Sequence, residues 1–298
     1  MTRVIKTLIV SAILAAPLAA CGAPATDAGS GTLRVIAGEN FWGSIAAQLG
    51  GSHVTVTSIV TNPNTDPHEY ESSATDARAF ATADYVVLNG AGYDTWASKL
   101  LSANPNQQRK VFTVADLLNK KAGDNPHFWY NPDWVDKVAD RITADYEALD
   151  AADAGYFGQQ REALRTALKP YHDAIARIRA TYTGVAVGST ESILVYLAQA
   201  LGFNLISPPE FMQAISEGTD PPAQTVAQFQ DQISHRQIRV LIYNTQTSTP
   251  ITDNLKQLAT QNGIPVVGIS ETVQPATASF QDWQIRQLNS LQAALRRQ

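Results

Sequence analysis

Two of the five histidines stand in matching contexts. His68 lies within residues 66–70 (DPHEY), and His127 lies within residues 125–129 (NPHFW). Proline fixes its own φ and restricts the residue before it, so each imidazole extends from a stiffened backbone. A ligand held in this way loses little entropy when it coordinates a metal. A single Pro-His pair is most often an ordinary turn, but the matched pair predicts two metal-binding imidazoles.

The other three histidines lack this context. His53 follows Gly51 and Ser52 at a turn before a strand, and it is expected to be exposed. His172 and His235 lie in polar helical stretches, where a solvated surface position is the preferred interpretation.

Two glutamates occupy positions where a metal would find carboxylate partners for these imidazoles. Glu191 ends a buried strand and begins a helix, and Glu271 follows the apolar strand 266–269. Ligand groups gather at the carboxyl ends of strands in open α/β sheets. The alternatives are a first-turn acid that complements the helix dipole for Glu191 and a surface loop acid for Glu271.

The loop 216–222 supplies two competing carboxylates, Glu217 and Asp220, although an N-cap role suits Asp220 better. Motifs for a zinc protease, a nucleotide phosphate loop and a serine hydrolase elbow are absent from the sequence.

The elements that must position these residues alternate between strand and helix. Strands are predicted at 32–37, 54–60 and 85–88, and again at 185–187, 203–206, 240–243 and 266–269. Between the two sets, apolar residues recur at spacings of three and four over 156–179. Pro170 interrupts that pattern, so the stretch is either one kinked helix or two shorter ones. We expect an α/β protein with two halves about a helical connector.

The first residues indicate export. Residues 1–20 begin with Arg3 and Lys6, continue as an apolar stretch and end in small residues, a pattern typical of a signal peptide. Residues 18–22 (LAACG) resemble the bacterial lipobox, which implies cleavage before Cys21 and lipidation of its sulfur. Residues 21–31 then read as the lipidated cysteine and a flexible tether.

Composition excludes several classes of function. The 298 residues are 44% hydrophobic and 16% charged, as in a globular chain. Beyond residue 20 the chain carries 20 bases against 27 acids, which gives no electrostatic footprint for nucleic acid. A single cysteine excludes a disulfide framework or a cysteine-based zinc site within one chain.

From about residue 33 onward, the sequence resembles the metal-binding lipoproteins of bacterial ABC importers for manganese, zinc or iron, the cluster A-I substrate-binding proteins. The most specific segments are residues 66–71 (DPHEYE) and 125–132 (NPHFWYNP). Residues 89–96 (NGAGYDTW) match the stretch between them, and residues 189–202 match the stretch that supplies a third ligand.

The resemblance implies a fold of two α/β lobes, each a mostly parallel sheet flanked by helices, joined by one long connector helix. It divides the chain into an N-terminal lobe (32–152), a connector (153–182) and a C-terminal lobe (183–298). It also implies a metal site in the cleft between the lobes, formed by His68, His127, Glu191 and Glu271.

The implied function is capture of a divalent transition metal at the outer face of the cell membrane. Delivery to an ABC permease with a cytoplasmic ATPase would follow. We expect a monomer anchored by a lipid at Cys21, with no catalytic activity and no bound nucleic acid.

The metal itself stays open at this stage. Zinc-type members commonly carry histidine where this chain has Glu191, and the family usually has aspartate where this chain has Glu271. Bidentate carboxylates would raise the coordination number above four and favour Mn²⁺ or Fe²⁺, although Zn²⁺ should also bind well. The alternatives are a zinc-specific protein of the same family, a secreted metallohydrolase and, ranked last, a surface adhesin.

Overall fold

The computed structural model describes residues 32–64 and 67–297. The predicted signal peptide, Cys21 and its tether lie outside the described residues, as does Asp66. Among the described residues, no helix combines the length and the apolar character that a membrane span requires.

The N-terminal lobe contains a parallel sheet with the strand order β2-β1-β3-β4. Its strands are β1 (Leu33–Glu39), β2 (Val54–Val60), β3 (Tyr85–Leu88) and β4 (Lys110–Thr113). Strand β1 pairs with β2 on one side and with β3 on the other. The crossover connections on the two sides of β1 therefore run toward opposite edges of the sheet. That arrangement creates a crevice at the carboxyl ends of the strands.

The C-terminal lobe repeats the arrangement with the order β6-β5-β7-β8, again with parallel pairing. Its strands are β5 (Ala186–Ser189), β6 (Asn204–Leu205), β7 (Leu241–Asn244) and β8 (Val266–Ile269). The carboxyl ends of β5 and β7 therefore lie side by side.

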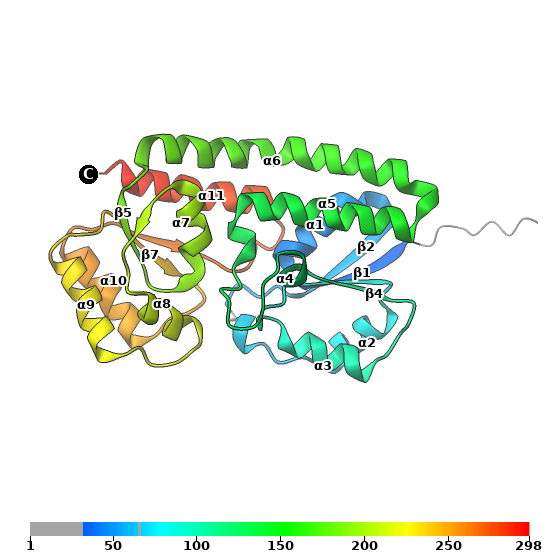
Figure 1. Ribbon diagram of the computed structural model, residues 1–298, viewed down its shortest axis with the longest axis horizontal. Helices are drawn as coiled ribbons and strands as arrows, with labels where there is room; N and C mark the ends of the chain where they lie inside the picture. Colours follow the sequence, from blue (N-terminus) through cyan, green and yellow to red (C-terminus); the bar gives the residue numbers. More distant parts are fainter. Residues whose placement is uncertain (1–31, 65–66, 298) are drawn as a thin grey trace, which may run out of the picture. The chain divides into compact units, whose positions relative to one another are not determined.

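Helices connect and flank the strands (Figure 1). They are α1 (Asn40–Gly50), α2 (Ala74–Thr82), α3 (Thr95–Ala103), α4 (Val114–Leu117), α5 (Pro132–Leu149), α6 (Ala154–Tyr182), α7 (Val195–Leu201), α8 (Pro209–Ser216), α9 (Ala223–Ser234), α10 (Pro250–Gln261) and α11 (Phe280–Leu295). The expected fold class, two α/β lobes with parallel sheets and one long connecting helix, is confirmed.

Helix α6 runs without interruption past both sheets (Figure 1). Its apolar stripe, with Leu164, Leu168 and Tyr171 among its buried members, faces the protein. Pro170 lies on the exposed side, where water can satisfy the carbonyl group that the missing N–H leaves without a partner. The stretch is thus one helix, and the two-helix alternative is wrong.

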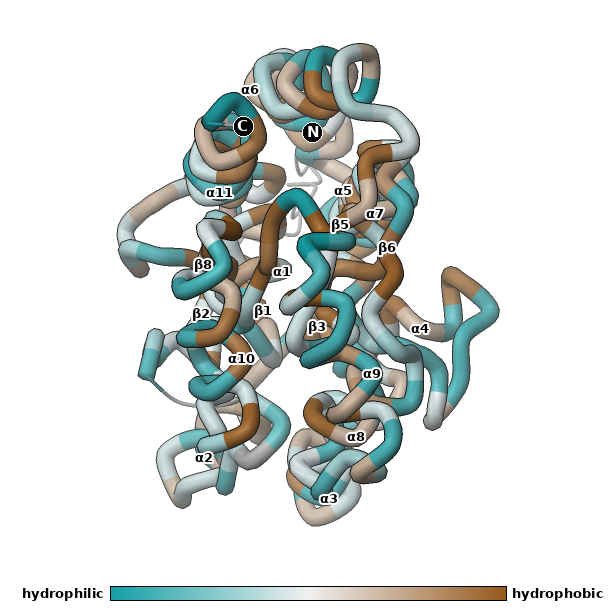
Figure 2. Tube along the Cα trace, turned by 90° about the vertical axis from the view of Figure 1, so that its left-hand side faces the viewer, coloured by the Kyte–Doolittle hydropathy of each residue, from teal (hydrophilic) through white to brown (hydrophobic). Residues whose placement is uncertain are grey.

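The largest group of buried apolar residues belongs to both lobes. It includes Val35 and Val87 of the first sheet, Val187 and Ile242 of the second, and the buried stripe of α6. Figure 2 places α6 and α11 together on one side of the sheets, as Figure 1 does. Each lobe also has a smaller cluster of its own, around Phe80 in the first and around residues 211–229 in the second.

Candidate metal centre

Three of the four residues expected to bind metal follow the carboxyl ends of strands, and His127 follows the loop after α4. His68 lies on the single 3₁₀ turn Pro67–Glu69 after β2, and His127 directly precedes the turn Phe128–Tyr130. Glu191 comes two residues after the end of β5, and Glu271 comes two residues after the end of β8. Two of the four candidate residues thus come from each lobe.

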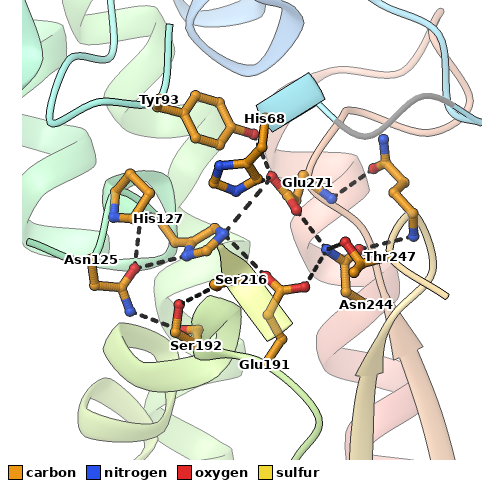
Figure 3. A network of polar contacts seen from close by, with 12 residues as sticks. His68, Tyr93, Asn125, His127, Glu191, Ser192, Ser216, Asn244, Thr247 and Glu271 are labelled. Atoms are coloured by element: carbon orange, nitrogen blue, oxygen red, sulfur yellow. Dashed lines mark hydrogen bonds and ion pairs between the residues drawn. The ribbon is translucent and has the colours of Figure 1, made fainter. Parts of the chain in front are cut away.

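The structure brings these four side chains together (Figure 3). The Nε2 atom of His127 lies 3.4 Å from Oε1 of Glu191 and 3.8 Å from Oε2 of Glu271. The Nε2 atom of His68 lies 3.5 Å from that same oxygen of Glu271. His127 and both glutamates are fully buried, whereas the His68 side chain is 22% exposed.

These separations suit a shared metal ion. In a tetrahedral site with bonds of 2.0–2.2 Å, neighbouring ligand atoms lie about 3.4 Å apart. Within residues 32–64 and 67–297, the buried Nε2 of His127 has no hydrogen-bond partner, although two carboxylate oxygens lie nearby. This nitrogen faces two carboxylate oxygens, and ionised carboxylates supply no proton for its lone pair. The arrangement therefore fits metal coordination better than a structural hydrogen bond.

Asn125 fixes the ring of His127. Its Oδ1 accepts from the backbone N–H of His127 at 3.0 Å and lies 2.7 Å from Nδ1 of the ring. Its Nδ2 donates to the carbonyl oxygen of Ser192 in the C-terminal lobe at 2.7 Å. Because backbone groups fix both ends of the amide, Nδ1 of His127 carries the proton and Nε2 presents its lone pair.

Burial and charge set the protonation of the buried pair. Burial lowers the pKa of His127, against the opposing effect of Glu271. Burial alone would raise the pKa of Glu271, but His68 and His127 outweigh it and lower that pKa to about 2, with a further contribution from a hydrogen bond donated by Tyr93. Both groups therefore favour the state that binds a cation, a neutral imidazole and an ionised carboxylate.

Residues that the sequence analysis did not identify hold the two carboxylates. Asn244, at the end of β7, donates from Nδ2 to Oε2 of Glu191 at 2.8 Å and to Oε1 of Glu271 at 2.5 Å. Gln246 accepts from the backbone N–H of Glu271 at 2.8 Å. The only sequence signal was their position after a buried strand, a place that also suits an ordinary turn.

The other candidates lie elsewhere. Glu217 is exposed and accepts from Gln213, and Asp220 is also exposed, so neither competing carboxylate joins the cluster. His172 and His235 pair with Asp136 and Asp231.

His53 differs from the expectation of an exposed turn residue. It is half-buried, pairs with Asp153 at 2.8 Å, and lies against the ring of Tyr156. His53, Asp150 and Asp153 together form a second group of potential metal ligands, which is more exposed than the first.

A cavity of about 570 Å³ lies beside the cluster and gives access to it. His68 and Tyr93 line it from the N-terminal lobe, and Ser192 and Ser216 line it from the C-terminal lobe. Of the four candidate residues, the partly exposed His68 is the one that lines this cavity.

Comparison with known proteins agrees with this architecture. The model of the ZnuA family, described as zinc-uptake complex component A, periplasmic, matches residues 35–294. The manganese-binding lipoprotein MntA of Halalkalibacterium halodurans is 26% identical over 217 residues, covering 70% of this chain and 71% of that protein.

Two further similarities show how varied the relatives are. The zinc-binding lipoprotein AdcA of Streptococcus pneumoniae is 22% identical over 71% of this chain, a match that spans 45% of that longer protein. The structure of the periplasmic zinc-binding protein TroA from Treponema pallidum superposes with a TM-score of 0.74. It is 16% identical and covers 89% of this chain and 99% of that one, so the likeness concerns the fold.

Proposed function

The chain belongs to the ZnuA family, and from that premise we propose that it is an extracytoplasmic substrate-binding protein for a divalent transition metal. The ion is cargo, captured between the lobes and handed to an ABC permease for import. The observation that carries the proposal is the convergence of four donor atoms from two lobes, with contacts of 3.4–3.8 Å.

The ligands are His68, His127, Glu191 and Glu271. Two imidazole nitrogens and two carboxylates suit Mn²⁺, Fe²⁺ and Zn²⁺, and intrinsic affinity rises toward Zn²⁺ along this series. MntA and AdcA bear the names of manganese-binding and zinc-binding proteins, so the family accommodates both metals. Import of Mn²⁺ or Fe²⁺ is the hypothesis from sequence, and a zinc-specific protein is its alternative.

The location follows from the first residues of the chain. Removal of residues 1–20 and lipidation of Cys21 would tether the protein to the outer face of the membrane. The relatives MntA and AdcA are named lipoproteins, which supports the anchor. We propose that the chain acts there as a monomer beside its permease.

A hydrolytic role has little support from the site. A catalytic zinc keeps one position open for water and has a general base nearby. Here four protein donors surround the position of the ion, and both buried glutamates belong to that set.

The test is metal content and uptake. Protein purified from its native host without added metal should contain one transition-metal ion per chain by elemental analysis. A variant with His53→Ala serves as the matched control, because it removes the more exposed cluster and should leave that one ion in place. Loss of the gene should reduce cellular uptake of the same metal. Purified protein without a transition metal, or uptake that is unchanged when the gene is lost, would contradict the proposal.

A further inference from the structure

One asparagine contacts both candidate carboxylate ligands. The Nδ2 atom of Asn244 donates to Oε2 of Glu191 and to Oε1 of Glu271, and Figure 3 shows it lying between the two. Its third acceptor, Oγ1 of Thr247, is more distant at 3.1 Å. The two protons of the amide are therefore directed mainly at the glutamates.

The orientation of this amide is determined by the backbone. Oδ1 of Asn244 accepts from the N–H of Gln246 at 2.9 Å, which places Nδ2 toward the carboxylates. The residue is 1% exposed and closes strand β7. Its side chain is thus held rigidly between the two glutamates.

The oxygens that Asn244 holds are not the ones that face the histidines. His127 faces Oε1 of Glu191, and both histidines face Oε2 of Glu271. Each glutamate thus has one inner oxygen toward the imidazoles and one outer oxygen bound to Asn244. The inner oxygens also accept a hydrogen bond each, from Ser216 and Tyr93. A carboxylate oxygen that accepts one hydrogen bond can still bind a metal through its second lone pair.

We propose that Asn244 determines which metal the site prefers, by restricting Glu191 and Glu271 to one metal-facing oxygen each. This inference rests on the proposed function, in which these two residues bind the transported ion. With both carboxylates monodentate, the protein supplies two nitrogens and two oxygens, a four-coordinate set that suits Zn²⁺.

The physical reason is that bidentate binding by either glutamate costs free energy. Bidentate binding would turn the outer oxygen of a glutamate toward the ion and away from Asn244. The amide would then exchange an ionised acceptor for the more distant hydroxyl of Thr247, which is unfavourable for a side chain that is 1% exposed. The bidentate arrangement that favours Mn²⁺ or Fe²⁺ is thereby disfavoured, so the structure opposes the preference inferred from sequence.

The test compares the wild type with Asn244→Ala. Co²⁺ is a spectroscopic probe, because four-coordinate Co²⁺ absorbs visible light strongly and six-coordinate Co²⁺ absorbs weakly. We expect a strong band in the wild type and a weaker one in Asn244→Ala, in which the outer oxygens are released. Competition titrations should show the Mn²⁺/Zn²⁺ affinity ratio rising about tenfold in the variant, within the range typical of partners behind a metal ligand.

Thr247→Ala is the matched control. It removes the third acceptor of the same amide and keeps both bonds from Asn244 to the glutamates, so the band and the affinity ratio should both stay as in the wild type. A weak, six-coordinate band in the wild type would overturn the inference without requiring any variant to fold. An unchanged band and ratio in folded Asn244→Ala would also overturn it, whereas a wild type that binds no metal would overturn the proposed function itself.

Discussion

The side chain of Asn40 pairs with both backbone groups of Val273, a residue 233 positions away in the chain. Its Oδ1 accepts from the N–H of Val273 at 2.9 Å, and its Nδ2 donates to the carbonyl oxygen at 3.2 Å. Asn40 begins α1 in the N-terminal lobe, whereas Val273 comes two residues after Glu271. A candidate ligand of the C-terminal half is therefore held in place partly by the opposite lobe.

Replacing Asn40 should loosen this attachment. Asn40→Ala leaves the buried N–H of Val273 without its acceptor, at a cost of about 1–3 kcal/mol in unfolding free energy. We expect a lower melting temperature and weaker metal binding, because Glu271 is no longer held in position. Denaturant unfolding and metal titration measure the two effects, and Asn254→Ala, an exposed asparagine on α10, is the control. Equal values for the two variants would contradict the role of Asn40.

Removing an imidazole of the cluster should greatly weaken metal binding. His127→Ala and His68→Ala should each cost more than the roughly 10–100-fold typical of residues that only support a ligand. His172→Ala and His235→Ala lack contact with the cluster and should leave the affinity unchanged. Isothermal titration with Zn²⁺ measures all four variants, and wild-type affinity in His127→Ala would remove the central claim of the site.

Metal binding should stabilise the folded protein. An ion that binds only the folded state adds about 4 kcal/mol at a thousandfold excess over its Kd, which corresponds to roughly 8–16 °C in melting temperature for a chain of this size. The protein without metal should still fold, because its apolar core does not include the cluster. Scanning fluorimetry should show this shift with Mn²⁺ or Zn²⁺ and not with Mg²⁺. The absence of a shift with every transition metal would count against a metal carrier.

A buried acid outside the cluster predicts a pH dependence. Glu39 is 1% exposed, and burial, with the nearby charges of Asp94 and Glu271, raises its pKa well above the ordinary value. The folded state then retains a proton that the unfolded state loses near pH 4.3, so its stability falls as the pH rises from there to the folded-state pKa.

Glu39→Gln should remove that dependence. In metal-free protein, the variant should melt at least about 2–4 °C above the wild type at pH 7, the shift expected from roughly 1 kcal/mol. The difference should shrink toward pH 4, where Glu39 is protonated in both states. Glu210→Gln, at an exposed position in the first turn of α8, is the control. A difference that is constant with pH would mean that Glu39 is ionised in the fold.

A change at position 191 should separate the metals. Glu191→His makes the set three nitrogens and one oxygen, which is favourable for Zn²⁺ and poor for Mn²⁺. We expect Mn²⁺ affinity to fall far more than Zn²⁺ affinity in competition titrations. If the Mn²⁺/Zn²⁺ affinity ratio equals that of the wild type, Glu191 does not bind the metal directly.

The sequence predicts the strands well where apolar residues run together, as in 85–88 and 266–269, or alternate with polar ones, as in 54–60. It does not reveal β4, because the four residues Lys110–Thr113 are too few and too mixed to show a period. The matched Pro-His contexts identify both imidazoles that the structure brings together. Asn244 could not be found in this way, since an asparagine after a strand looks like a turn residue until tertiary structure places it between two carboxylates.

The apolar core shared by both lobes has a consequence for how the chain unfolds. Because Val35 and Val187 belong to one buried cluster, neither half can lose its structure without exposing part of the other. Thermal denaturation of residues 32–298 should therefore follow a single cooperative transition, with equal calorimetric and van't Hoff enthalpies. A fragment cut after residue 182 would expose that surface and aggregate. A metal ion that holds the cleft closed would then protect amide hydrogens from exchange in both halves, including those far from the cluster.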